Sequence, residues 1–349
     1  MAEPGPTNPL QNDPRIDPRI KAVFGAFPAP QPNPVEDREA LLARVNTDEA
    51  IAVRTAMEQF MKLCDTDAIA PSAGLRTSLH TFTADSAGTE CNIQLIRPDD
   101  DRVLPCVYYI HGGGMQALSC MHGNYRAWGR MLAANDLVVA MIDFRNALIP
   151  SSVPDVAPYP AGLNDCVAGL KWVLSQAGEF GIDPAHVIVS GESGGGNLTL
   201  ATGLKLKAVG DLGLIRGLYA LCPYIAGHWP QERLPSSTEN NGILINLHDN
   251  TGAVAYGIQT LTDRDPLAWP GFASEDDVRG LVPTVISVNE CDPLRDEGIE
   301  FYRLLLRAGV PARCQMAVGT VHGTEIFPVC CPDVSRAAAA SIADFCRTA

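Results

Sequence analysis

Ser193 lies in the segment VIVSGESGGGN, residues 187–197, between a β-branched run and a run of apolar residues with helical spacing. Val187, Ile188 and Val189 predict the end of a buried strand. The flanking glycines allow a sharp turn into the next helix and keep bulky side chains away from the hydroxyl. G-x-S-x-G between a strand and a helix is typical of a nucleophilic serine. The segment therefore predicts chemistry at Ser193.

A glycine-rich loop that binds phosphate is the alternative interpretation of this segment. A P-loop requires a lysine after its glycines, and here Asn197 and Leu198 follow them instead. The dinucleotide pattern G-x-G-x-x-G is not matched either. The segment therefore favours a nucleophile.

A serine hydroxyl is a weak nucleophile, so Ser193 needs a general base and an acid that orients the base. The chain has seven histidines. His322, in TVHGTEIF, comes just after RCQMAVGT, the last predicted strand, and Gly323 follows it. We predict that His322 is the base.

The acid is expected on the loop after the preceding strand, where NECDPLRDEG offers four acidic residues. They are Glu290, Asp292, Asp296 and Glu297. Asp296 and Glu297 fall where a helix begins, a place that favours acidic residues through the helix dipole alone. Asp292 stands just past the strand, before Pro293, and is the predicted acid. Serine, aspartate and histidine then follow each other in an order known for such triads.

The tetrahedral intermediate of acyl transfer needs hydrogen-bond donors for its oxyanion. The segment YYIHGGGM ends a predicted strand, and its glycines let amide N–H groups point into one cavity. We predict that the N–H groups of Gly113, Gly114 and Gly194 form this oxyanion hole, with His111 bracing the loop. The side chains expected along the mouth of the site follow: Met115, His122, Tyr125 and Trp128.

The elements that must position these residues read as strands alternating with helices. The predicted strands are residues 77–84, 91–98, 103–110, 137–144, 186–191, 217–224, 283–290 and 313–320. The first two predict an antiparallel hairpin, and a final helix is expected over residues 333–347. Unbroken apolar strands between helices favour a mostly parallel central sheet flanked by helices on both faces, an α/β fold.

Two regions do not fit this alternation. Residues 1–36 are rich in proline and predict an extended or wrapping arm, followed by helices over residues 37–45 and 47–66. Residues 225–275 contain proline, asparagine and glycine breaks around one short helix-like piece. We interpret them as an insertion over the carboxyl edge of the sheet, where such folds bind ligands. The apolar side expected for the second helix comprises Ile51, Val53, Met57, Phe60, Met61 and Cys64.

The composition excludes several classes of function. The net charge is −14 without a lysine- or arginine-rich run, which disfavours nucleic acid and anionic membranes as partners. The N-terminal segment lacks the apolar core of a signal peptide. The sequence contains no run of about 18 apolar residues, so no transmembrane segment is expected. Eleven cysteines without metal-like spacing indicate reduced thiols and a cytoplasmic location. No metal and no cofactor are expected.

The segments HGGGM, GESGGGN, DPLRDEG and VHG, in this order, resemble the hormone-sensitive lipase family of α/β-hydrolases, as does PYPAGLNDC. More narrowly, DFRNA, ENNG, FASEDDVRGL and NECDPLRDEGI resemble the bacterial brefeldin A esterase branch. DFRNA departs from the D-Y-R-L-A-P-E of the wider family, and Gly194 replaces a common alanine. Both variants resemble those of that branch. They therefore bear on the choice of substrate and not on the type of reaction.

The resemblance implies an α/β-hydrolase fold with a helical cap. Residues 1–70 would form the N-terminal arm and cap helices, and residues 71–349 the catalytic domain, with 225–275 as a cap insertion. It implies a carboxylesterase that acts through a Ser-His-Asp triad and an acyl-enzyme on small to medium esters, bulky or cyclic ones included. A lactonase, amidase or acyltransferase with the same triad stays open, as does a homodimer. A non-catalytic ligand receptor is disfavoured, because all three triad members are present.

Overall fold

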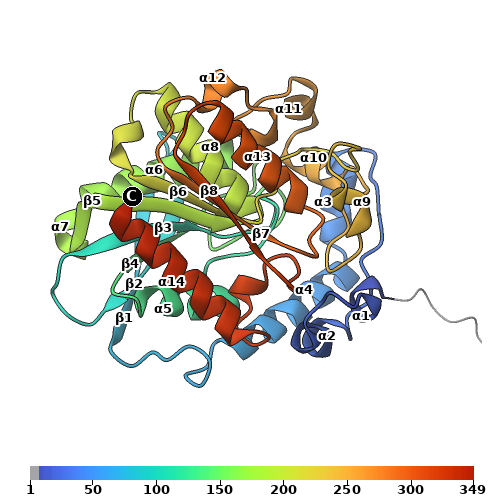
Figure 1. The fold of residues 1–349 in the computed structure, drawn as a ribbon, viewed down its shortest axis with the longest axis horizontal. Coiled ribbons are helices and arrows are strands. Elements are labelled where there is room, and N and C mark those ends of the chain that lie inside the picture. Colours follow the sequence, from blue (N-terminus) through green and yellow to red (C-terminus); the bar gives the residue numbers. More distant parts are fainter. Residues whose placement is uncertain (1–7) are drawn as a thin grey trace, which may run out of the picture.

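The computed structural model describes residues 8–349, which fold around one sheet of eight strands (Figure 1). The strands lie in the order β1-β2-β4-β3-β5-β6-β7-β8. Their bounds are β1 Leu75–Thr83, β2 Glu90–Pro98, β3 Leu104–Ile110, β4 Val138–Asp143, β5 Ile182–Glu192, β6 Gly217–Leu221, β7 Thr284–Asn289 and β8 Ala312–Ala317.

The sheet is mostly parallel, which confirms the predicted fold class. β1 and β2 form the predicted antiparallel hairpin, and β2 is antiparallel to β4. Every later pair is parallel, from β4–β3 to β7–β8. The carboxyl ends of these parallel strands therefore meet at one edge of the sheet, where the loops that carry the candidate residues begin.

Five long helices cover the two faces of the sheet (Figure 1). α5 (Gly123–Ala133) and α14 (Pro332–Thr348) pack on one face, and α6 (Ala161–Ser175), α8 (Gly194–Ala208) and α13 (Arg295–Arg307) pack on the other. Along β3, Val107 and Tyr109 join the core under α5 and α14, whereas Tyr108 and Ile110 join the opposite core. The strands are continuously apolar because both of their faces are buried.

The remaining elements complete the described chain. They are α1 Pro9–Asn12, α2 Pro18–Phe24, α3 Arg38–Val45, α4 Asp48–Met61, η1 Lys62–Cys64, α7 Ala177–Phe180, η2 Leu212–Leu214, α9 Ser236–Glu239, α10 Thr251–Tyr256, α11 Ile258–Thr262, η3 Pro270–Phe272, α12 Glu275–Val278 and η4 Thr324–Ile326.

The proline-rich N-terminal segment contains two short helices that the sequence analysis did not predict, α1 and α2. Each begins with a proline, Pro9 or Pro18, and the side chain of the residue before it, Asn8 or Asp17, caps the helix. Proline is tolerated in the first turn because its missing N–H has no partner there in any case. The density of prolines therefore marked helix starts as well as extended chain.

The helix predicted over residues 47–66 is α4, which ends at Met61. Its predicted apolar side is confirmed only towards the C-terminal end, where Met61 and the following Cys64 are buried and Phe60 packs on Phe24 and Phe27. It is wrong at the other end, where Ile51 is 44 % exposed and Val53 is 62 % exposed. Residues two positions apart lie on nearly opposite sides of a helix. Ile51 and Val53 therefore cannot both face the core.

The insertion, residues 225–275, contains α9, α10, α11 and η3 instead of one helical piece. It lies beside the N-terminal segment, with α3 next to α10 in Figure 1. Asn250 joins the two regions, because its Nδ2 donates to the Val35 carbonyl at 2.7 Å and its Oδ1 accepts from the Val35 N–H at 2.9 Å. These two regions, distant in sequence, are thus joined by the side-chain amide of Asn250.

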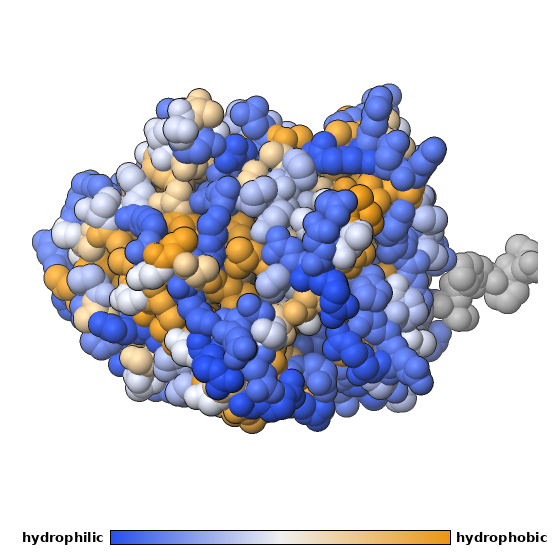
Figure 2. Space-filling model, turned by 90° about the horizontal axis from the view of Figure 1, so that it is seen from above, coloured by the Kyte–Doolittle hydropathy of each residue, from blue (hydrophilic) through white to orange (hydrophobic). Residues whose placement is uncertain are grey.

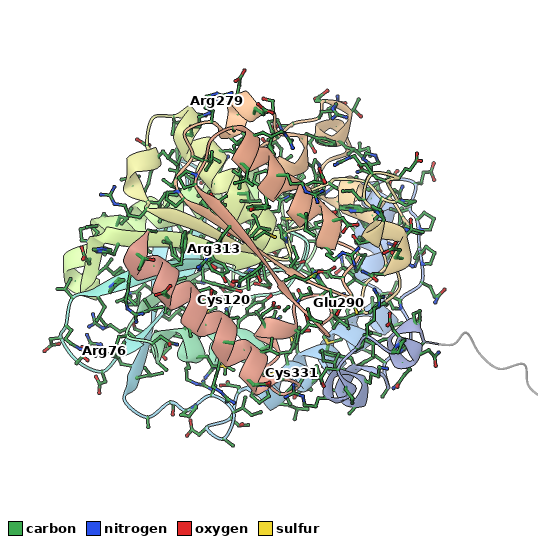
Figure 3. The ribbon with its side chains drawn as sticks, viewed as in Figure 1. Arg76, Cys120, Arg279, Glu290, Arg313 and Cys331 are labelled. Carbon is green, nitrogen blue, oxygen red and sulfur yellow. The ribbon has the colours of Figure 1, made fainter. Side chains whose placement is uncertain are left out.

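All eleven cysteines are free thiols, among them Cys120 and Cys331, which Figure 3 labels. None of the helices within residues 8–349 combines the length and apolarity needed to cross a membrane. On the face seen from above, hydrophilic side chains surround smaller apolar areas (Figure 2).

Candidate active site

Ser193 sits at a strained turn between β5 and α8, with φ 56° and ψ −119°. Its N–H donates to the Leu221 carbonyl at 3.0 Å, and its carbonyl accepts from Asn197 at 3.0 Å and from Tyr224 at 3.1 Å. A positive φ costs free energy for any residue with a Cβ, so the surrounding hydrogen bonds must hold it. The predicted sharp turn is present, and it places the hydroxyl at the carboxyl edge of the sheet.

The structure brings the three predicted triad residues together. His322 Nε2 lies 2.8 Å from Ser193 Oγ, and His322 Nδ1 lies 2.7 Å from Asp292 Oδ2. Asp292 is fully buried and His322 is 9 % exposed. The second oxygen of Asp292 accepts from the Leu294 N–H at 2.8 Å, which fixes the carboxylate. One imidazole thus bridges a hydroxyl and a carboxylate.

The electrostatics favour a basic imidazole. Burial lowers the pKa of His322, but the charge and hydrogen bond of Asp292, together with a contact to Cys222, raise it by more. The net effect is a His322 pKa above its ordinary value. A positioned group with a raised pKa accepts a proton more readily from a hydroxyl.

The other acidic residues of the same loop have different partners. Asp296 accepts from the Ser236 N–H at 2.7 Å and pairs with Arg295 at 2.8 Å. Glu290 accepts from the Gly319 N–H at 2.8 Å. Glu297 is buried and holds the start of the insertion, where it accepts from the Ile225 N–H at 2.6 Å and from Trp229 Nε1 at 2.6 Å. Of the four candidates, Asp292 alone contacts His322.

The predicted oxyanion glycines converge beside Ser193. Gly113 and Gly114 have φ of 92° and 63°, a left-handed backbone that glycine adopts without strain. A Cβ on Gly194 would lie 2.7 Å from the Gly114 nitrogen, so the elbow and the loop are in backbone contact. Within residues 8–349, the N–H groups of Gly113 and Gly114 donate to no other protein group. They are free to bind an anion.

Glu192, which the sequence analysis did not single out, holds this loop from behind. It is buried, and its Oε1 accepts from the Gly112 N–H at 2.7 Å and from the Tyr125 hydroxyl at 2.5 Å. Its Oε2 accepts from the Tyr109 hydroxyl at 2.5 Å. Burial raises the pKa of Glu192 to about 7, against the effect of the two tyrosine hydrogen bonds. The sequence signal that could have identified Glu192 was its position, as a charged residue directly before the predicted nucleophile.

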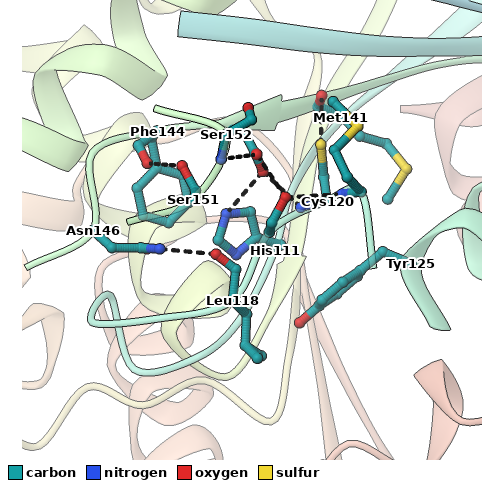
Figure 4. Close-up of polar contacts among 12 residues, drawn as sticks. His111, Leu118, Cys120, Tyr125, Met141, Phe144, Asn146, Ser151 and Ser152 are labelled. Atoms are coloured by element: carbon teal, nitrogen blue, oxygen red, sulfur yellow. Dashed lines mark hydrogen bonds and ion pairs between the residues drawn. The ribbon is translucent and has the colours of Figure 1, made fainter. Parts of the chain in front are cut away.

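His111 braces the loop from the other side (Figure 4). Its Nδ1 lies 2.9 Å from the Gly112 carbonyl, and its ring stacks on Phe144 at 4.4 Å between centroids. Its Nε2 lies 3.5 Å from Asp143 Oδ1. Asp143 also accepts from the Ser119 hydroxyl at 2.6 Å and from the Ser152 N–H at 2.9 Å. These contacts tie the loop to the end of β4.

Three of the four residues expected along the mouth are buried. Tyr125 and Trp128 are fully buried in the core under α5 and α14, because the helix that carries them packs on the sheet. Met115 is also buried. His122 is partly exposed and lies 4.0 Å from Glu58 of α4.

The sheet order, the elbow and the position of the histidine define an α/β-hydrolase. A family profile described as the alpha/beta hydrolase fold matches residues 107–326. The carboxylesterase NlhH of Mycobacterium tuberculosis is 30 % identical over 97 % of this chain and 97 % of its own length. The chain therefore belongs to the α/β-hydrolase family, and it is a carboxylesterase.

Solved structures place it more narrowly. The structure of esterase Est22 is 64 % identical, with a TM-score of 0.96 over 98 % of this chain and 99 % of that one. Brefeldin A esterase, described as a bacterial homologue of human hormone-sensitive lipase, is 38 % identical, with a TM-score of 0.82 over 97 % of this chain and 94 % of that one. The resemblance to the hormone-sensitive lipase family is thus confirmed.

Proposed function

We propose that this carboxylesterase hydrolyses small to medium carboxylic esters, bulky or cyclic ones included, through Ser193, His322 and Asp292. The observation that carries the proposal is the single imidazole held 2.8 Å from the Ser193 hydroxyl and 2.7 Å from the Asp292 carboxylate. A hydroxyl, a base and an orienting acid in this arrangement generate a nucleophile at neutral pH.

In acylation, Ser193 Oγ attacks the ester carbonyl while His322 Nε2 takes the hydroxyl proton. The imidazolium that forms is stabilised by Asp292, and the N–H groups of Gly113, Gly114 and Gly194 bind the oxyanion. Each such donor stabilises the transition state by about 2.7–4 kcal/mol in other enzymes. The intermediate collapses as the C–O bond to the alcohol breaks and His322 gives its proton to the leaving oxygen.

In deacylation, His322 takes a proton from a water molecule, whose oxygen attacks the acyl carbonyl. The same oxyanion donors bind the second intermediate. Ser193 Oγ leaves with the proton held by His322, which releases the carboxylic acid and restores the free serine. No step needs a metal or a cofactor.

A serine-directed organophosphorus reagent tests the nucleophile. We expect one adduct on the peptide that contains residues 187–204, and no adduct on that peptide in Ser193→Ala. Ser190→Ala is a matched control on the same peptide, because Ser190 is buried within β5. Labelling that survives Ser193→Ala would show that the nucleophile lies elsewhere.

A substrate panel tests the specificity. A solved structure of esterase Est22 contains p-nitrophenol, the alcohol product of a p-nitrophenyl ester, which supports this class of probe. We expect turnover of p-nitrophenyl esters of short and medium acyl length, alongside lactones and diesters. Preferential turnover of lactones or amides, or acyl transfer to added alcohols, would instead identify one of the alternatives. Stoichiometric binding without turnover would identify a receptor.

We also propose that the N-terminal segment and the insertion together form a cap over Ser193. Arg15 of the arm donates to Asn240 Oδ1 of the insertion at 2.8 Å. Asn240 Nδ2 in turn donates to the Asp292 carbonyl at 3.1 Å. The arm is thus connected to the loop of the proposed acid through one asparagine.

Deletion of residues 1–66 tests this cap. We expect a large loss of activity while the sheet stays folded by circular dichroism, because the deletion removes the contacts with Asn240 and Asn250. Arg15→Ala is the milder comparison, since it removes one contact and keeps the arm. Full activity of the deletion variant on all esters would show that the segment is dispensable.

A further inference from the structure

Cys222 follows β6 directly and lies between the elbow and the neighbouring strand. Its backbone has a φ of 33°, which is unusual for a residue with a side chain. Its N–H donates to the Ser287 carbonyl of β7 at 2.7 Å, and the carbonyl of the preceding Leu221 accepts from Ser193. The backbone of Cys222 is therefore fixed on both sides, next to the proposed nucleophile.

The side chain of Cys222 belongs to a compact group of three side chains of the types that bind metals in proteins. One ligand atom each of Cys222, Asp292 and His322 lies within 4.8 Å of the others, and all three residues are buried. From this geometry we propose that Cys222, Asp292 and His322 form a binding site for a thiophilic divalent cation, Zn²⁺ or Cd²⁺, which inhibits the enzyme.

The set of donors matches this class of cation. Thiolate, imidazole and carboxylate are the ligands that zinc takes in proteins, and three protein ligands leave its fourth position to water or another oxygen. Bonds of about 2.0–2.3 Å in a tetrahedron place ligand atoms roughly 3.3–3.8 Å apart. The three ligand atoms, which lie within 4.8 Å of one another, must shift to reach that spacing. A soft thiolate favours Zn²⁺ and Cd²⁺ over Mg²⁺ and Ca²⁺.

The charges around the group also favour a cation. Glu325 is buried, and within residues 8–349 its Oε2 has no hydrogen-bond partner. Burial raises the pKa of Glu325, and its charged form acts on both Cys222 and His322. The whole chain carries a net charge of −14, which raises the local concentration of cations.

Inhibition follows because the imidazole of His322 would bind the cation and is also the proposed base. A cation bound to His322 occupies a nitrogen that otherwise accepts the Ser193 proton or pairs with Asp292. Catalysis would then stop without any change at Ser193. This inhibitory effect rests on the proposed function, whereas binding of the cation does not.

The binding test uses the full-length protein, treated with EDTA and then dialysed. Cd²⁺ is titrated while the ultraviolet charge-transfer absorbance of the cadmium–thiolate bond is recorded, for the wild type, Cys222→Ser, His322→Ala and Cys314→Ser. Cys314 is the control, because it is the cysteine that is not fully buried and it lies on β8. Thermal melting checks the fold of each variant.

We expect one cadmium–thiolate signal per chain in the wild type and in Cys314→Ser. Loss of a supporting group costs roughly 10- to 100-fold in metal affinity, so loss of a ligand in Cys222→Ser or His322→Ala should cost at least that. Equal affinity in either folded variant, or no signal in the wild type, would overturn the site. If one variant does not fold, the other decides.

A parallel assay follows hydrolysis of a p-nitrophenyl ester with increasing Zn²⁺, each variant normalised to its own metal-free rate. We expect inhibition of the wild type that EDTA reverses, and a roughly tenfold or greater rise in the inhibitory concentration for Cys222→Ser. Equal inhibition of both would contradict the site. A cadmium signal in a protein that hydrolyses no ester would contradict the proposed function and leave the metal site standing.

Discussion

Two histidine–carboxylate pairs lie at the carboxyl edge of the sheet, and their surroundings differ. In one pair, His322 Nδ1 lies 2.7 Å from Asp292 Oδ2, and the other nitrogen faces Ser193. In the other pair, His111 Nε2 lies 3.5 Å from Asp143 Oδ1. The ring of His111 is fully buried and stacked on Phe144.

The carboxylates explain the difference. Asp143 accepts hydrogen bonds from Ser119, Cys120 and Ser152, so its charge is shared among several donors. Burial lowers the pKa of His111, and Asp143 does not compensate. Asp292 bonds to Leu294 with one oxygen and offers the other to His322, whose pKa is raised. The same two residue types thus give a structural brace in one place and a candidate base in the other.

The largest expected effect comes from removal of the candidate base. We expect His322→Ala to lower kcat/KM for p-nitrophenyl esters by about 10⁴- to 10⁶-fold, because Ser193 then has no proton acceptor. His122→Ala and His248→Ala should retain most of the activity, since neither ring contacts the triad. A fully active His322→Ala enzyme would contradict the proposed mechanism.

A smaller loss is expected from the acid. Asp292→Asn should lower kcat by about 10⁴-fold, because it removes the charge that orients and stabilises the imidazolium. Asp296→Asn, on the same loop, should cost far less, since Asp296 pairs with Arg295 and Ser236. A larger loss in Asp296→Asn would reverse our assignment.

The pH profile sharpens the same comparison. His322 must be neutral to accept a proton, and its pKa is raised. The wild-type kcat/KM should therefore rise with pH through one ionisation above the ordinary histidine value of about 6.5, and then level off. In Asp292→Asn the midpoint of the residual activity should move down. An unchanged midpoint in Asp292→Asn would show that Asp292 does not raise the pKa of His322.

A third, intermediate effect is expected behind the oxyanion loop. In Glu192→Gln an amide nitrogen replaces one carboxylate oxygen, and a nitrogen of this kind cannot accept the hydrogen bonds that the oxygen accepts from Tyr109, or from Tyr125 and Gly112. We expect a roughly 10- to 100-fold lower kcat with a smaller change in KM, because small displacements of positioning groups act on the transition state. Glu192→Asp, which keeps the charge, should recover part of the loss. A change confined to KM would contradict a role in positioning.

The smallest effect on catalysis is expected at His111. His111→Asn keeps a donor for the Gly112 carbonyl but loses the stacking on Phe144 and the group that faces Asp143. We expect unfolding free energy to fall by about 1–3 kcal/mol in urea denaturation. The pH midpoint of kcat/KM should stay unchanged. A shifted midpoint would show that His111 also titrates in the reaction.

Local patterns were sufficient to predict the sheet, the elbow and the order of the candidate residues. Strands that are apolar throughout predict burial on both faces, and glycines around Ser193 predict a turn, because both rules depend on neighbouring residues only. The apolar residues of α4 did not all mark its buried side, since Ile51 and Val53 are apolar but exposed. Hydrophobicity alone does not tell which face of a helix finds a partner.

The sequence by itself determined the candidate nucleophile, base and acid, since a turn, a strand end and a loop each mark one position along the chain. Tertiary structure decided which groups meet. Asp292 contacts His322, whereas Glu297 accepts a hydrogen bond from the insertion. Glu192 accepts one from Gly112, which lies 80 residues away in the sequence. Cys222 joins Asp292 and His322 although no spacing rule connects them. The physical reason is that parallel strands bring the ends of distant segments to one edge, and sequence spacing does not encode those distances.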